Sequence, residues 1–189
     1  MTAFLLGWWA LAFAQTAPDS AEVVRLREEI VRLAQKNAWT GVERLYGQLL
    51  GMDAQLGCDV HLYAAQAAMS DGRATLAFRR LQRMQEPAPT DDPSVRTAWD
   101  TGSRELASLQ QQFRFVAIHV APPAEPTLAR PEAPFAQLER DAIARASETL
   151  SASRTFRGLL PLGGYVIGGE PVTVEPGEDW QVVAIGFQP

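Results

Sequence analysis

The sequence predicts an α+β protein, in which antiparallel helical hairpins with about five helices precede a small antiparallel β-sandwich-like module with one inserted helix. Two observations carry this prediction. Up to Gln112, apolar residues recur three and four positions apart, the spacing that places them on one face of a helix. From Phe113, runs rich in β-branched and aromatic residues alternate with glycine and proline turns, which is typical of short strands.

The first 14 residues are interpreted as an export signal. Residues 1–14 carry no charged side chain, and Ala12 and Ala14 stand at the −3 and −1 positions of a cleavage site before Gln15. A membrane-spanning helix needs about 20 apolar residues, so this run is short for a span. We therefore expect cleavage, a flexible leader at 15–19, and a periplasmic or secreted protein with no stable membrane span. An uncleaved short anchor is the alternative.

Two similar helical hairpins are predicted at residues 20–54 and 58–89. A shift of about 35 residues aligns Asn37 with Gly72, and these are the residue types that best tolerate the left-handed conformation at the end of a helix. The same shift aligns three apolar positions of each second helix: Val42 with Ala77, Tyr46 with Leu81, and Leu49 with Met84. Residues 20–54 and 58–89 are therefore interpreted as two copies of one unit.

The second hairpin resembles a tetratricopeptide repeat. Small residues in both helices, a glycine turn and a closing proline fall in place, at Ala65, Gly72, Ala77, Leu81 and Pro89. The pattern has a large aromatic residue early in the first helix, where this chain has His61. The resemblance implies stacked helix pairs that curve around a binding groove. A generic four-helix bundle satisfies the same apolar spacing and is the alternative.

The helical region is expected to close with one more helix. Residues 85–93 read as a linker, and residues 94–111 then form a helix with an apolar face. A stack of helix pairs leaves its last unit with an exposed apolar face, which a further helix commonly covers. We therefore assign 94–111 this capping role and place the whole helical domain at 20–112.

The β module is expected at residues 113–189. A first strand at 113–121 is followed by a proline-rich loop at 122–134 and a helix at 135–151, with Phe135 opening its apolar stripe. Four further strands are predicted at 155–160, 164–167, 172–174 and 180–185, with glycine and proline turns between them.

One hairpin in this module resembles those of PEGA-type β modules, which are small prealbumin-like domains of bacterial surface proteins. The matching residues are Leu160-Pro161, Gly163, Tyr165 and the alternation of Val172 with Val174. The loop and helix inserted after the first strand depart from that pattern. The segment Phe156–Tyr165 also resembles a C-terminal element of an uncharacterised group of exported bacterial repeat proteins, and this resemblance implies no activity.

Composition narrows the function classes. The net charge of −5 and the lack of a long basic cluster argue against a nucleic-acid binder. A single cysteine, Cys58, excludes an intramolecular disulfide and a cysteine-rich metal site, and only two histidines are present. No nucleophile elbow, phosphate loop or HExxH motif occurs. We therefore expect no enzymatic activity, no cofactor and no metal.

Three aromatic residues in the helical region are the candidates for partner contact: Trp39, Tyr46 and Trp99. The sequence is thus interpreted as an exported, non-enzymatic protein that binds a protein or peptide partner through its helical repeats, in the cell envelope. A structural or assembly protein that acts through an exposed strand edge of its β module is the alternative. An enzyme is disfavoured, and a deep pocket lined by His61 and carboxylates would favour it.

Overall fold

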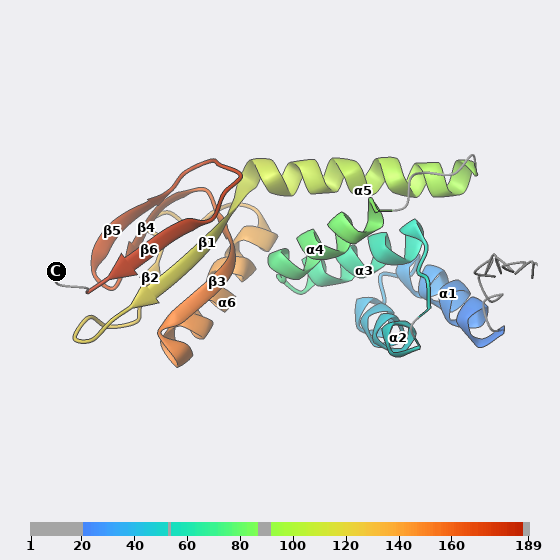
Figure 1. Cartoon of the computed structure of the whole chain (residues 1–189), viewed down its shortest axis with the longest axis horizontal. Helices are drawn as coiled ribbons and strands as arrows, with labels where there is room; N and C mark the ends of the chain where they lie inside the picture. The colour runs from blue at the N-terminus through green and yellow to red at the C-terminus, as the bar shows by residue number, and fades with distance from the viewer. Residues whose placement is uncertain (1–20, 53, 87–91, 187–189) are drawn as a thin grey trace, which may run out of the picture.

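The computed structural model describes residues 21–52, 54–86 and 92–186 (Figure 1). The elements follow in the order α1 (Ala21–Ala34), α2 (Trp39–Gly51), α3 (Cys58–Ser70), α4 (Ala74–Met84), α5 (Pro93–Gln112), β1 (Phe113–Val120), β2 (Leu128–Ala129), α6 (Gln137–Ser153), β3 (Thr155–Pro161), β4 (Gly163–Ile167), β5 (Glu170–Val174) and β6 (Gln181–Ile185). Helices followed by a β module confirm the predicted α+β class. The predicted signal at 1–14 and leader at 15–19 lie outside the described residues.

The two hairpins share the same turn, 35 residues apart. Asn37 and Gly72 both have positive φ, at 54° and 68°. The next residue after each closes the turn by donating its N–H to the carbonyl five positions back, from Ala38 to Leu33 at 2.9 Å and from Arg73 to Ala68 at 2.8 Å. This bond is the mark of a Schellman C-cap. The backbone therefore repeats with the period that the sequence alignment gave.

The long helix α5 covers the second hairpin and continues directly into β1 (Figure 1). Gly102 allows the close approach, because a β-carbon there would lie 2.4 Å from the Met84 sulfur. Leu106 and Leu109 are buried against the same cluster. The α5 helix thus packs on α3 and α4 along one side and connects the helical region to the β module.

The helical region and the β module pack into one body. The core cluster of the second hairpin also contains Phe113 of β1, Ala142 of α6 and Leu159 of β3. The Leu159 N–H donates to the hydroxyl of Thr75 in α4 at 2.8 Å. A Cβ on Gly72 would lie 2.3 Å from the Cβ of Asp141, so α6 also lies against the α3–α4 turn.

The β module contains two three-stranded sheets, in the orders β3-β1-β6 and β2-β4-β5. Four apolar side chains that point inward from the two sheets and from α6 illustrate their common core: Ile118, Leu150, Tyr165 and Val183. One pairing differs from the expected antiparallel arrangement, because β6 runs parallel to β1, with Val116 opposite Gln181. Parallel neighbours need a long crossover, and the intervening α6 and second sheet provide it.

Two local details also differ from the sequence prediction. The proline-rich segment contains the two-residue strand β2, which pairs with β4. The helix after it begins at Gln137, so Phe135 lies before the helix and is fully exposed instead of opening its apolar stripe. Ala142, Ala146 and Leu150 carry the buried stripe of α6.

Candidate functional site

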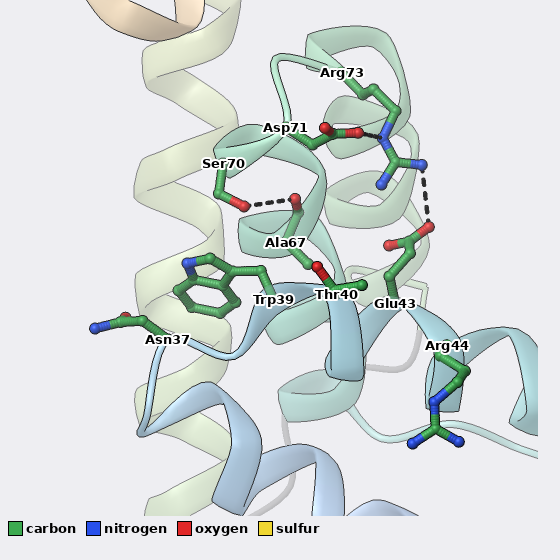
Figure 2. A pocket seen from close by; sticks show the side chains of 9 residues that line it. All are labelled: Asn37, Trp39, Thr40, Glu43, Arg44, Ala67, Ser70, Asp71 and Arg73. Atoms are coloured by element: carbon green, nitrogen blue, oxygen red, sulfur yellow. Dashed lines mark hydrogen bonds and ion pairs between the residues drawn. The ribbon is translucent and has the colours of Figure 1, made fainter.

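A pocket of about 640 Å³ lies between the two hairpins, on the side where both hairpins turn (Figure 2). We call it the repeat pocket. The first turns of α2, the end of α3 and the α3–α4 turn line it, with the residues Asn37, Trp39, Thr40, Glu43, Arg44, Ala67, Ser70, Asp71 and Arg73. Because residues four apart share a face of a helix, Trp39 lies above Glu43 and Thr40 above Arg44 on α2.

Glu43 is the centre of an ion-pair network below the pocket. The two guanidinium nitrogens of Arg80 donate to its two carboxylate oxygens at 2.6 and 2.7 Å, which is a bidentate pair. Arg73 adds a third contact to Glu43 at 3.2 Å. These neighbours, Arg80 first, hold the pKa of Glu43 below its usual value. Glu43 is therefore ionised at neutral pH.

Arg80 itself is buried, with a relative exposure of 6%. Besides Glu43, it donates to the Ala64 carbonyl at 2.7 Å, and its guanidinium lies 4.5 Å from the centre of the Tyr46 ring. The Tyr46 hydroxyl in turn lies 3.0 Å from Nδ1 of His61. Desolvation lowers the pKa of His61, which favours a neutral imidazole. This layer fixes Arg80 in place beneath the pocket.

Asp71 forms the second half of the network and connects it to the β module. Arg73 contacts one of its carboxylate oxygens at 2.7 Å, and Arg145 of α6 contacts the other at 3.0 Å. Arg145 also donates to the Asp71 backbone carbonyl at 2.8 Å. The turn of the second hairpin is thus held from both the helical and the β side.

The residues that line the repeat pocket carry two positive and two negative charges. Arg44 and Arg73 line the pocket together with Glu43 and Asp71, whereas Arg80 and Arg145 pair with these two carboxylates from outside the lining. Arg44 is exposed, and no described residue pairs with its guanidinium. In Figure 2 it points away from Asp71 and Arg73, on the opposite side of the pocket from Trp39. Among the charged residues that line the pocket, Arg44 is thus the one without an ion-pair partner in the described part of the chain.

The structure separates the three aromatic residues that the sequence proposed for partner contact. Trp39 is half-buried and lines the repeat pocket. Tyr46 is 1% exposed and lies in the core of the first hairpin, so it supports the pocket from beneath and has no surface for a partner. Trp99 is half-buried on α5 against the second hairpin, and its indole N–H has no acceptor among the described residues.

The charged residues of the network were missed by sequence reasoning, but one signal was present. The 35-residue shift that aligns the hairpins places Arg80 at the position of Leu45, which is buried in the first hairpin. An arginine at a buried position requires a carboxylate partner. Nothing in the local sequence indicated that Glu43, 37 residues away, would be that partner.

Cys58 and His61 lie away from the repeat pocket. Cys58 is buried, and desolvation raises the pKa of its thiol. The pocket contains neither His61 nor Cys58. Within residues 21–52, 54–86 and 92–186, no three His, Cys, Asp or Glu side chains are grouped as a metal site.

Comparisons with family models, curated proteins and solved structures find no match to this chain. Across the part of the chain that the structure describes, no helix combines the length and apolar character needed to cross a membrane.

Proposed function

We propose that this chain is a non-enzymatic, exported protein of the cell envelope that binds an acidic segment of a partner protein or peptide at the repeat pocket. One observation carries the proposal: half-buried Trp39 and exposed Arg44, which pairs with no described residue, line the same pocket. Aromatic and arginine side chains dominate binding hot spots, and the unpaired guanidinium of Arg44 favours a negatively charged partner. The interpretation of residues 1–14 as a signal supports the envelope location.

The pocket is preorganised on one side and adaptable on the other. Arg73 and Arg80 are held by Glu43 and Asp71, so binding does not need to order them. Arg44 is exposed and available to a carboxylate of the partner. Because such exposed charges are screened by salt, we expect modest affinity that weakens as ionic strength rises.

Fluorescence anisotropy of the full-length protein with a labelled peptide of alternating glutamate and leucine tests this function. A matched lysine-leucine peptide should bind at least about tenfold more weakly, which corresponds to about 1.4 kcal/mol. Arg44→Glu should weaken binding of the acidic peptide by a similar factor. The control Arg79→Glu changes the charge equally at an exposed position of α4 outside the pocket, and should leave binding unchanged. Equal affinity for both peptides would refute the proposal.

A specific feature favours self-assembly through the β module as a second candidate function. The strand β6 is at the edge of its sheet, and Val182 on it is 76% exposed. An apolar edge strand can pair with a second chain. Light scattering should then show an oligomer for the natural sequence and a monomer for Val182→Lys, whereas Val24→Lys, at an exposed valine of α1, should leave the oligomer intact. This candidate is refuted when light scattering shows the natural sequence to be monomeric at every protein concentration measured.

A further inference from the structure

A second hollow, of about 560 Å³, lies where the helical region meets the β module. We call it the amide groove. It is bordered by α4, α5, the start of β1, β3 and the loop between β5 and β6. Its volume is within the range of about 300 to 1,000 Å³ that is usual for small-ligand sites, and such sites occur preferentially where two structural units meet.

Two aromatic rings lie at the floor of the amide groove, and of these Phe78 is only 5% exposed. Phe78 of α4 and Phe115 of β1 both line it, and their ring centres lie 5.0 Å apart at an interplanar angle of 89°. Phe115 is half-buried, and the centre of its ring lies 4.9 Å from the centre of the Trp180 ring. Trp180 is 40% exposed, and the Arg157 guanidinium lies 4.9 Å from the centre of its ring. Trp180 therefore lies next to the floor of the groove, beside Phe115, without lining the groove itself.

Three neutral amides lie on the helical side of the rim of the groove. Gln82 projects from α4, and Gln110 and Gln111 project from the end of α5. All three side chains are exposed, and no described residue hydrogen-bonds to their amides. Each amide offers two donor hydrogens and an acceptor oxygen. The groove thus presents several unused donors and acceptors above an aromatic floor.

Charge contributes little to this site. Arg114 lines the groove, but its guanidinium donates to the backbone carbonyls of Glu175 and Asp179, at 2.9 and 3.1 Å, and so holds the β5–β6 loop in place. Glu178 of that loop is the carboxylate on the rim. A strongly charged ligand therefore has no set of opposite charges to pair with. This distinguishes the amide groove from the repeat pocket, where the guanidinium of Arg44 is exposed and pairs with no described residue.

We infer that the amide groove binds a neutral oligosaccharide. Sugar rings present apolar C–H faces, which suit an aromatic floor, and many hydroxyls, which both donate to and accept from side-chain amides. A purely apolar ligand would leave the glutamine amides without partners, and burying them unpaired is unfavourable. This inference is independent of the peptide-binding function proposed for the repeat pocket.

The inference is tested with the full-length protein on an array of neutral oligosaccharides, followed by titration calorimetry with chitotetraose, cellotetraose and maltotetraose. We expect saturable binding of at least one of these probes. Gln82→Ala and Gln110→Ala should each weaken that binding by about fivefold, which is the loss of roughly one hydrogen bond of about 1 kcal/mol. Because both side chains are exposed, these variants should fold normally.

The matched control is Gln48→Ala, at an exposed glutamine of α2 that lies outside the amide groove, and it should retain full binding. Absence of binding on the array, or binding that the two groove variants leave unchanged, overturns the inference. If the two groove variants also lose binding of the acidic peptide, the inference is overturned, since the groove would then be a peptide site. The Arg44→Glu variant should bind oligosaccharide normally, so failure of one proposal is distinguishable from failure of the other.

Discussion

Replacing Arg80 by methionine should strongly destabilise the protein. Removing one partner of a buried ion pair typically costs about 3 to 5 kcal/mol, because the other charge is left unpaired. Here the loss is reduced, since Glu43 keeps Arg73 at 3.2 Å and 28% of its side chain is exposed. The hydrogen bond to the Ala64 carbonyl and the contact with the Tyr46 ring are lost as well. We expect a decrease of about 3 kcal/mol in the free energy of unfolding.

Urea unfolding followed by far-UV circular dichroism measures this change, provided that the transition remains two-state with an unchanged slope. The matched control is Arg79→Met, at the neighbouring but exposed arginine of the same helix, which should change the free energy of unfolding by less than about 0.5 kcal/mol. Arg80→Met combined with Glu43→Gln should recover a large part of the loss, because no unpaired carboxylate remains.

The cost of Arg80→Met should also depend on pH. The folded-state pKa of Glu43 is lowered mainly by Arg80, so this pair stabilises the natural protein above the unfolded-state pKa of glutamate, about 4.3, and the contribution is lost as pH falls. The difference between the natural protein and the variant should therefore be smaller at pH 4 than at pH 7. Equal effects of Arg80→Met and Arg79→Met at pH 7 would show that the ion-pair reasoning is wrong.

Three further predictions concern stability. Gly72→Ala should lower the free energy of unfolding by more than about 2 kcal/mol, because φ is +68° and the new β-carbon would lie 2.3 Å from the β-carbon of Asp141 in α6. Gly47→Ala, where nothing lies within 4 Å of the new β-carbon, should instead raise it by up to about 1 kcal/mol in the same urea assay. Glu105→Gln should raise the melting temperature at pH 7 but not at pH 4, since burial raises the pKa of this carboxyl and disfavours its charged form; a lower melting temperature at pH 7 argues against this. The folded-state pKa of His61 is below 6.5, so the free energy of unfolding should decrease as pH falls below 6.5, where the unfolded chain binds the proton first. His61→Gln should reduce this decrease between pH 7 and 5. An unchanged dependence of the free energy of unfolding on pH contradicts the prediction.

The elements that could be predicted from the sequence are those that depend on neighbouring residues. Asn37 and Gly72 marked the two helix ends, because few residue types adopt positive φ without strain. The change of apolar period at Phe113 marked the start of β1, where the helical pattern ends. Phe135 shows the limit of such reasoning: the helix begins two residues later than its apolar pattern indicated.

The candidate sites were only partly predictable. Trp39 was identified from residue type alone, and it lines the repeat pocket. Tyr46 was also identified from its residue type, but it is buried because its position on α2 faces α3. The amide groove could not be predicted, since its glutamines have ordinary surface spacing on α4 and α5 and its phenylalanine floor comes partly from a strand.

By itself, the sequence determined the fold class, the repeated hairpin and the position of most helices and strands, because periodicity and turn chemistry act over a few residues. The tertiary structure alone decided which distant residues meet. It paired Glu43 with Arg80 across 37 positions and Asp71 with Arg145 across 74, and it placed β6 parallel to β1. Such pairings depend on how whole elements pack to bury their apolar faces, and no local pattern of residues specifies them.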